Sequence, residues 1–267
     1  MKLEPTGERM IVEHYRSSPE DYVIYLFHLA TYQFAEQYTS GRRVLDYGCG
    51  SGYGSSMIAK SAAHVTAVDV ATDAISHARK EFGGPNIDFM SIDPEQPLPF
   101  ADASFDTVLS FQVFEHVANT DRYLSEIRRV LVPDGKLVLV TPDRATRLLP
   151  FQKPWNRWHL KEYDDTSLKK LVTAYFPDTD ILNMSGRRDV IDIEIRRCTR
   201  LKWMTLPFTL PFFTDRVRVG LLNKLHALRV RPSGETAPQL SFDYDESVIR
   251  IESDAAPSVN LVAVASK

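Results

Sequence analysis

Hydrophobic and polar positions follow two alternating periods between residues 41 and 145. Short apolar runs of the kind that form buried strands occupy residues 44–45, 64–68, 87–90, 107–111 and 136–140. Between them, apolar residues recur at helical spacing over residues 53–61, 72–82 and 120–131. Strands that alternate with helices along a chain form a parallel sheet with helices on both faces. The pattern therefore predicts a doubly wound α/β fold.

Further elements are expected at both ends of the chain. Ser18 as N-cap, Pro19 at the first helical position and Asp21 three residues after the cap predict the start of a helix. We expect residues 1–40 to form a helical lid on the main domain. Additional helix and strand patterns cover residues 168–176, 180–184 and 259–265, and the last of these suits a buried closing strand.

Residues 187–250 interrupt this pattern and are expected to be an insertion. The chain is expected to leave the sheet at 186 and return at 251, so residues 41–186 and 251–267 form one domain. Within the insertion, residues 187–231 hold eleven Lys or Arg and four Asp or Glu, a local charge of +7 in a chain of net charge −3. The rest of the chain is therefore acidic, at −10.

The composition of the 267 residues, 43% hydrophobic and 25% charged, is that of a globular protein. No apolar stretch approaches the roughly 18 to 20 residues that span a bilayer, and the chain does not open with a signal-peptide core. We therefore expect a cytoplasmic protein. Its two cysteines, Cys49 and Cys198, support neither a disulfide framework nor a cysteine-based zinc site.

Four glycines stand at alternate positions, 48, 50, 52 and 54, directly after the first predicted strand. A backbone needs so many missing side chains where a ligand approaches it closely. The dinucleotide-binding template fails because its last glycine falls on Tyr53 or on Ser55. A phosphate-binding loop fails because no Gly-Lys-Ser/Thr follows. The loop therefore predicts a ligand that lies along it without a pyrophosphate.

Three acids, Asp46, Asp69 and Asp93, accompany the ends of successive predicted strands. One such acid alone is more often a helix cap or a solvated loop residue, but three at one sheet edge favour a binding site. Asp69 is placed to accept both hydroxyls of a ribose, and Asp93 to accept from an exocyclic amine. Ile92 is apolar enough to cover an aromatic base. Together these residues outline an adenosine site.

The loop Asp46-x-Gly48-x-Gly50-x-Gly52 resembles the first motif of the class I S-adenosylmethionine-dependent methyltransferases. Further similar stretches are residues 98–100, 104–106, 111–117 and 129–136. The resemblance covers residues 41–185 and the last strand, and leaves the insertion outside. It implies a Rossmann-like sheet of seven strands, mostly parallel with an antiparallel last strand. It also implies S-adenosyl-L-methionine as cofactor, with S-adenosyl-L-homocysteine as product.

This resemblance assigns roles to individual residues. It implies that Gly48 and Gly50 pass the methionine moiety, that Asp69 holds the ribose and that Asp93 holds the adenine amine. Gln112 would lie near the sulfonium. The cofactor-binding set that the family implies is completed by Asp46, Gly52, Val70 and Ile92.

A shorter match indicates a narrower group. Gly7-Glu8-Arg9, followed later by Gly52-Tyr53-Gly54, is similar to bacterial methyltransferases encoded with polysaccharide and glycolipid assembly enzymes. This similarity implies that the N-terminal lid brings Arg9 or Tyr15 near the cofactor carboxylate. A solvated amphipathic arm is the alternative.

Two histidines are candidate bases for an acceptor hydroxyl, because an imidazole suits proton removal near neutral pH. His116 follows the fourth strand at the rim of the cofactor site, with helix capping as the alternative role. Residues 155–163 resemble the family's Asn-x-x-His-x-x-Glu stretch, which borders the acceptor pocket in relatives, and Asn156, His159 and Glu162 match it. His159 is therefore the rival base, unless it and Glu162 only fix the loop, and Glu162 is the third candidate. No acidic cluster is assignable to a metal, so the sequence supports no metal ligand but does not exclude a metal.

The acceptor is the least specific part of the prediction. Trp155 and Trp158 beside basic groups are typical of a sugar site, although they suit a flat aromatic acceptor as well. In the insertion, basic residues precede an apolar run, 203–213, that is too short to span a membrane. These features fit an anionic membrane surface or a lipid-linked, phosphate-bearing acceptor at the inner face of the membrane. A solvated basic face beside an acceptor lid or a homodimer contact is the favoured alternative. Nucleic acid is not expected, because the positive charge is local and the pI is about 6.2.

We therefore predict an S-adenosylmethionine-dependent O-methyltransferase. Its acceptor is expected to be a sugar hydroxyl of a polysaccharide or glycolipid precursor, methylated by in-line transfer with help from a general base. A small-molecule methyltransferase that acts on a phenol or an amine is the first alternative. A non-catalytic scaffold that binds S-adenosylmethionine is the second.

Overall fold

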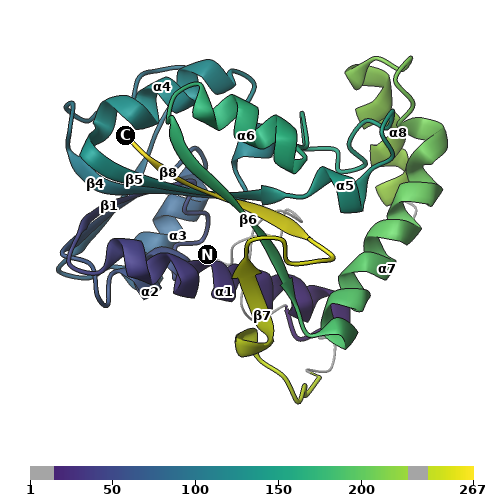
Figure 1. Ribbon diagram of the computed structural model, residues 1–267, viewed down its shortest axis with the longest axis horizontal. Coiled ribbons are helices and arrows are strands. Elements are labelled where there is room, and N and C mark those ends of the chain that lie inside the picture. Colours follow the sequence, from purple (N-terminus) through teal and green to yellow (C-terminus); the bar gives the residue numbers. More distant parts are fainter. Residues whose placement is uncertain (1–14, 228–239) are drawn as a thin grey trace.

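One sheet of eight strands organises the computed structural model, which describes residues 15–227 and 240–267. Its strands are β1 (Arg43–Tyr47), β2 (His64–Asp69), β3 (Ile87–Ser91), β4 (Phe105–Phe111), β5 (Leu131–Pro142), β6 (Asp178–Gly186), β7 (Ile249–Glu252) and β8 (Asn260–Ser266). Their spatial order is β3-β2-β1-β4-β5-β8-β6-β7 (Figure 1). The expectation of a doubly wound α/β fold is confirmed.

The strands from β3 to β5 pair in parallel, and β8 inserts antiparallel between β5 and β6, as expected for the last strand. The expected count of seven strands is wrong, because β7 pairs antiparallel with β6 at the outer edge. The four residues of β7 alternate isoleucine with a charged residue, which suits an edge strand but is too short to stand out as a pattern. The boundary expected between residues 250 and 251 falls inside this strand.

The order of the strands reverses next to β1, which lies between β2 and β4. The helix that follows β1 packs on one face of the sheet and the helix that follows β4 packs on the other. The carboxyl ends of these two strands therefore border a crevice. Open α/β sheets bind their ligands at such a reversal point.

Helices cover both faces of the sheet (Figure 1). On one face lie α1 (Pro19–Thr39), α2 (Tyr53–Ile58) and α3 (Thr72–Phe82), and on the other lie α4 (Thr120–Val130) and α6 (Asp165–Thr173). In α4, Tyr123, Leu124, Ile127 and Val130 recur at helical spacing and are buried, so this stripe holds the helix against the sheet. The predicted helices at 72–82 and 120–131 agree with α3 and α4 to within one residue, whereas the one predicted at 53–61 ends at Ile58.

Helix α1 begins as its sequence predicts, since the Ser18 hydroxyl accepts a hydrogen bond from the Asp21 amide at 3.1 Å. Val23 and Leu26 are completely buried, and α1 contacts α2, β4 and α7. It is therefore a core helix of one layer. The remainder of the expected lid, including Arg9, lies outside the described residues.

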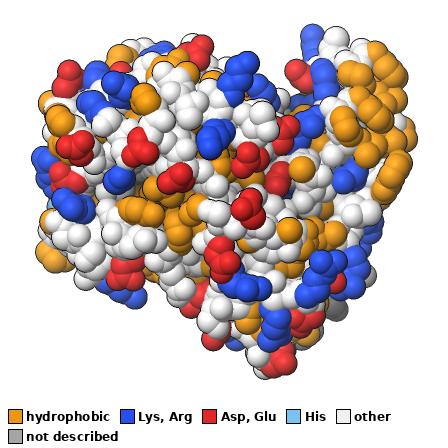
Figure 2. Space-filling view, viewed as in Figure 1, with side chains coloured by type: hydrophobic (Ala, Val, Ile, Leu, Met, Phe, Trp, Pro, Cys, Tyr) orange, Lys and Arg blue, Asp and Glu red, His pale blue; other side chains and the backbone are white. Residues whose placement is uncertain are grey.

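The insertion contributes helices that stand at the side of the domain. Helix α7 (Arg188–Thr205) contacts both α1 and the short α5 (Arg144–Arg147), and α8 (Asp215–Ala227) follows it (Figure 1). Single 3₁₀ turns occupy Phe114–His116, Leu206–Phe208 and Glu246–Val248. Trp203 and Phe212 are exposed, and Figure 2 shows apolar side chains gathered beside Lys and Arg over this part of the surface. Among the described residues, no helix has the length and apolar character needed to cross a membrane.

Candidate active site

A cavity of about 480 Å³ opens where β1, β2 and β4 end. Its wall includes Tyr47 at the end of β1, Asp69 at the end of β2 and Phe111 at the end of β4. His28 and Tyr32, one turn apart on α1, close it from the side. The cavity thus occupies the crevice that the strand order predicts, and we call it the cofactor cavity.

The glycine loop forms the floor of the cofactor cavity. Its backbone has positive φ angles, which residues with a side chain rarely adopt. Gly48 has φ +99°, and a Cβ atom there would lie 2.2 Å from Cγ2 of Val113. Gly50 has φ +53°, and a Cβ atom there would meet nothing within 4 Å. Gly48 is therefore required by its neighbours, whereas Gly50 leaves open space where a ligand can approach the backbone.

Asp69 is held at the edge of this loop by two backbone amides. Its Oδ2 accepts from the Gly50 amide and its Oδ1 accepts from the Ala71 amide, both at 2.9 Å. A carboxylate oxygen can accept more than one hydrogen bond, so both oxygens keep capacity for a hydroxyl pair. Val70 and Ile92 add apolar wall on the same side of the cavity.

The structure brings together most, but not all, of the predicted cofactor-binding residues. The cofactor cavity is lined by Gly48, Gly50, Asp69, Val70, Ile92, Gln112 and His116. It is not lined by Asp46, Gly52 or Asp93. Tyr15 lines the neighbouring cavity described below. The three residues that do not line the cavity have local structural roles, because each stabilises a turn or a loop near the site.

Gly52 and Asp93 show those roles most simply. Gly52 has φ +84°, and a Cβ atom there would lie 2.6 Å from Cβ of Ala78, so it allows the turn into α2. Asp93 is exposed, and its carboxylate accepts from the Glu95 amide at 2.9 Å. In this structure Asp93 therefore shapes its own turn instead of reaching the cavity wall.

Asp46 is buried beneath the glycine loop. Its Oδ2 accepts from the Ser55 hydroxyl at 2.6 Å and from the Tyr32 hydroxyl at 3.3 Å, while Oδ1 has no partner among the described residues. Burial raises the pKa of the Asp46 carboxyl to about 6, although both hydrogen bonds favour the charged form. The carboxylate therefore joins β1, α1 and α2 at a cost in stability near neutral pH.

The raised pKa of Asp46 predicts how stability depends on pH. The folded protein holds this proton more tightly than the unfolded chain, whose carboxyl has the ordinary pKa of 3.8, so the free energy of unfolding should fall as pH rises from about 4 to about 6. Asp46→Asn removes this titration. Its stability relative to wild type should therefore rise by up to about 3 kcal/mol between pH 4 and pH 7. Urea denaturation at both pH values measures the difference.

Asp134 is the matched control, because it is exposed and its positive φ suits asparagine. Asp134→Asn should give the same difference from wild type at both pH values. A pH-independent difference for Asp46→Asn as well would contradict the assignment of the titration to Asp46.

A second cavity, of about 380 Å³, adjoins the first. His28, Gln112 and Trp158 line both cavities, so the two spaces meet at these side chains. Burial lowers the pKa of His28 to about 4, which keeps its ring neutral at physiological pH. We call this space the acceptor cavity.

Helix α7 forms one wall of the acceptor cavity. Glu194, Arg197, Leu201 and Thr205 line it, and their spacing of three, four and four residues places them on one face of the helix. Trp155 lies opposite, near the guanidinium groups of both Arg197, at 5.6 Å, and Arg147, at 4.1 Å from its ring centroid. The predicted insertion therefore contributes directly to this cavity.

The loop between β5 and α6 carries the two matched residues His159 and Glu162. Nδ1 of His159 lies 2.7 Å from Oε1 of Glu162, and Nε of Arg147 donates to Oε2 at 3.0 Å. All three side chains are buried. Burial alone would raise the pKa of Glu162, but the positive charge of Arg147 and the His159 hydrogen bond outweigh it and lower that pKa to about 2. Glu162 is therefore ionised and orients the imidazole.

Arg218 of α8 fixes the backbone of the same loop. It is 1% exposed, and its guanidinium donates to the carbonyls of Pro154, Asn156 and His159 at 2.6 to 3.2 Å. A buried guanidinium that finds three carbonyl acceptors holds the loop in one conformation. The insertion thus positions His159 as well as walling the cavity.

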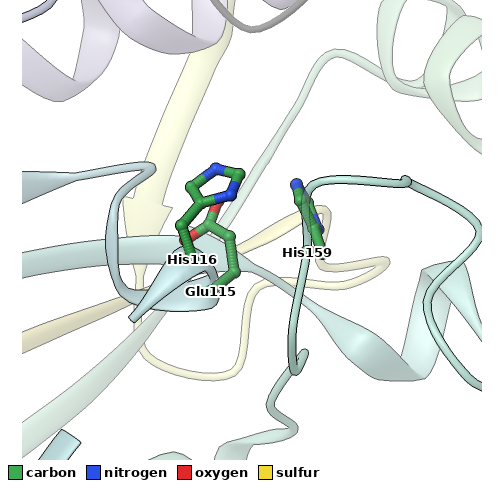
Figure 3. Close-up of side chains that lie close together, drawn as sticks. All are labelled: Glu115, His116 and His159. Atoms are coloured by element: carbon green, nitrogen blue, oxygen red, sulfur yellow. The ribbon is translucent and has the colours of Figure 1, made fainter. Parts of the chain in front are cut away.

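His116 and His159 meet at the junction of the two cavities. His116 lines the cofactor cavity, His159 lines the acceptor cavity, and their ring centroids are 4.9 Å apart at an angle of 86°. Glu115 lies beside them (Figure 3), buried, with its carboxylate accepting from the Thr141 hydroxyl at 3.0 Å. Both candidate bases therefore stand where an acceptor would meet the cofactor.

Sequence reasoning missed several residues that the structure places at the site. His28 and Tyr32 recur one turn apart on α1, and the four α7 residues share one helix face, so helical spacing of polar side chains was an available signal. Glu115 carried no such signal. It is recognisable only when two segments more than forty residues apart in the chain come together.

Comparison with known proteins agrees with this architecture. A family model described as a methyltransferase domain matches residues 45–139. A Mycolicibacterium smegmatis protein named a probable S-adenosylmethionine-dependent methyltransferase is 33% identical over 195 residues, 73% of each chain. A ubiquinone biosynthesis O-methyltransferase of Maricaulis maris is 37% identical over 111 residues, 40% of this chain and 43% of that one. The solved structure of a methyltransferase from Thermotoga maritima has a TM-score of 0.57 at 14% identity, over 92% of both chains, and shows the same fold.

The chain therefore belongs to the S-adenosylmethionine-dependent methyltransferases, and its cofactor is S-adenosylmethionine. The cofactor cavity fits this molecule. Gly50 leaves its backbone open, Asp69 would hold the ribose hydroxyls, and Val70 and Ile92 would cover the adenine ring. Gln112 stands where the cavities meet, so the sulfonium would lie on that side.

Asp69→Ala tests this assignment. Loss of a charge-assisted contact of about 1.5 to 3 kcal/mol should weaken S-adenosylmethionine binding roughly 10- to 150-fold, as measured by calorimetry. Asp93→Ala is the matched control, because Asp93 also follows a strand yet does not line the cavity. The control should bind within a few-fold of wild type. Equal losses in both variants would show that Asp93 reaches the cofactor after all.

Proposed function

We propose that this enzyme methylates a hydroxyl group of a sugar in a polysaccharide or glycolipid precursor. The observation that carries the proposal is the buried series Arg147, Glu162 and His159, whose imidazole lines the acceptor cavity. An acceptor hydroxyl must lose its proton during transfer, and an imidazole held by a carboxylate is suited to take it.

The chemistry divides between the cofactor and the chain. S-adenosylmethionine supplies a methyl group that its sulfonium has already activated. The protein must orient the acceptor oxygen, exclude water and remove one proton. His28, Gln112 and Trp158 line both cavities and so restrict how an acceptor approaches the cofactor. His159 would take the hydroxyl proton, while Glu162 stabilises the imidazolium that forms.

The lining of the acceptor cavity favours a sugar over a flat apolar ring. Trp155 and Trp158 offer aromatic faces, and Asn156, Arg157 and the ion pair Glu194–Arg197 offer polar groups. A lipophilic phenol would cover these polar groups without satisfying their hydrogen bonds. The name of the ubiquinone O-methyltransferase relative nevertheless makes a phenol the acceptor class to test against.

A homocysteine-release assay with S-adenosylmethionine tests the acceptor class. The panel holds simple glycosides, nucleotide sugars, lipid-linked sugars, phenols and amines. Turnover on a glycoside or sugar conjugate is the expected result. Turnover only on phenols or amines would replace the proposal with a small-molecule methyltransferase. Cofactor binding without release on any acceptor, including cell extract, would indicate a non-catalytic scaffold.

A further inference from the structure

We propose that Glu115, His116 and His159 bind one divalent transition-metal ion between the cofactor and acceptor cavities. One possible ligand atom from each residue lies within 4.8 Å of the other two. Glu115 and His116 come from the turn after β4 and His159 from the loop after β5 (Figure 3). One carboxylate and two imidazoles are a ligand set that proteins use for catalytic metal ions.

The hydrogen bonds behind both imidazoles match those of metal-binding histidines. Nδ1 of His116 lies 3.0 Å from the Trp158 carbonyl oxygen, and Nδ1 of His159 lies 2.7 Å from Oε1 of Glu162. These oxygens accept, so each ring donates from Nδ1, and a metal ion would bind at Nε2. Histidine ligands almost always donate their other N–H to a carboxylate or a backbone carbonyl in this way.

Glu115 supplies the negative charge at the site. It is 1% exposed, and within the described part of the chain it forms no salt bridge with Lys or Arg. The Thr141 hydroxyl donates to its Oε2 at 3.0 Å, which orients the carboxylate. Buried charges in proteins are paired or coordinate metals. A bound cation would therefore compensate this carboxylate, which has no Lys or Arg partner among the described residues.

The donor set also indicates which ions fit. Two nitrogen ligands and one oxygen suit Zn²⁺ and neighbouring first-row ions, whereas Mg²⁺ and Ca²⁺ prefer oxygen ligands. Ligand atoms around tetrahedral Zn²⁺, with bonds of about 2.0 to 2.1 Å, stand about 3.4 Å apart. Since the ligand atoms lie within 4.8 Å of one another, binding requires them to approach by up to about 1.4 Å, which side-chain rotation allows.

Three protein ligands leave a coordination position for an acceptor oxygen. An ion there would lower the pKa of a hydroxyl that reaches it from the acceptor cavity. A coordinated His159 has no lone pair left for a proton, so with the ion bound the acidified hydroxyl would lose its proton to solvent, and the ion would replace His159 in the part that the proposed function gives it. This role in turnover rests on the proposed function, but metal binding itself does not. The site would explain why two histidines and a carboxylate converge at the junction when one base would be enough.

Metal binding can be measured without cofactor or acceptor. Protein stripped with a chelator is titrated with Zn²⁺ and analysed for bound metal, and Co²⁺ is added to a second sample for its visible absorption spectrum. The variants are Glu115→Gln, His116→Gln and His159→Gln. The control is His64→Gln. His64 lies on the surface, its Nε2 lies 3.0 Å from Oδ2 of Asp88, and it is far from the cluster in sequence.

We expect one Zn²⁺ per chain in wild type and in the control, and an affinity at least about 10-fold lower in each of the three variants. Failure of wild type to bind Zn²⁺ or Co²⁺ stoichiometrically would overturn the proposal, as would unchanged binding in the three variants. If a variant does not fold, as judged by circular dichroism, the Co²⁺ spectrum of wild type decides. A spectrum that matches aqueous Co²⁺ would overturn the site, and an intense tetrahedral spectrum would support it.

Discussion

His159→Ala should lower turnover about 100-fold or more and leave the Kd for S-adenosylmethionine unchanged. The imidazole lines the acceptor cavity and not the cofactor cavity, so its loss affects proton removal and leaves the ribose and adenine contacts intact. The turnover number is measured by homocysteine release on the best acceptor from the panel, and the Kd by calorimetry. Turnover would fall in this way whether His159 is a base or a metal ligand. The Zn²⁺ titration distinguishes these two roles.

Two companion variants locate the effect. His116→Ala removes the ring on the cofactor side, and Glu162→Gln removes the charge that orients His159 but keeps the side-chain shape. Glu162→Gln should lower turnover in the same direction as His159→Ala. A loss in His116→Ala without one in His159→Ala would move the base to His116. Full activity in both histidine variants would leave Glu162 or solvent as the proton acceptor.

Gly48→Ala should destabilise the protein by about 2 to 5 kcal/mol and abolish cofactor binding. A left-handed backbone costs an alanine about 1 to 2 kcal/mol, and forcing a methyl group against Val113 adds about 1 to 3 kcal/mol. The amides of Gly48 and Cys49 donate to the Val68 carbonyl at 2.8 and 3.0 Å, so a shift at Gly48 also moves the loop away from β2. Urea denaturation and calorimetry measure the two effects.

Gly50→Ala is the informative comparison. Its φ is also positive, but a Cβ atom there meets no protein atom within 4 Å. The variant should therefore lose only about 1 to 2 kcal/mol of stability for the backbone conformation. Its affinity for S-adenosylmethionine should fall because the added methyl group enters the space that the cofactor occupies. Equal stability losses in both variants would contradict the contact with Val113.

Periodicity was sufficient to predict the sheet up to β5 and the helices α3 and α4. In these elements, buried residues recur so regularly that the local pattern and the tertiary structure agree. It failed at β7, where two isoleucines in four residues acquire their structure only by pairing with β6. Short edge strands depend on a partner that the local sequence does not show.

The candidate site was predictable where one segment carries it. The glycine loop and Asp69 lie within 22 residues of each other, and both line the cofactor cavity. Asp46 and Asp93 were assigned by the same logic, but one turns beneath the loop and the other turns into solvent. Which way an acid points at a strand end depends on its local hydrogen bonds, such as that between Ser55 and Asp46, and not on spacing.

The acceptor cavity was not predictable in the same way. Its walls come from α1, the loop after β5 and α7, which are distant in the chain. The basic excess of the insertion indicated an exposed charged face. The structure instead half-buries Arg197 against Glu194 and buries Arg218 against three carbonyls, so part of that charge is internal. A count of charges does not reveal which guanidinium groups are buried.

The hydrogen bonds from Arg218 to the loop that carries His159 limit how the acceptor preference can be re-engineered. Helix α8, which lines the acceptor cavity together with α7, also fixes the backbone of the loop that carries His159, the expected proton acceptor. Exchanging α7 and α8 for those of a relative would therefore alter recognition and chemistry together. A working chimaera should require the segment 154–163 from the same donor, whereas the glycine loop and Asp69 can stay as they are.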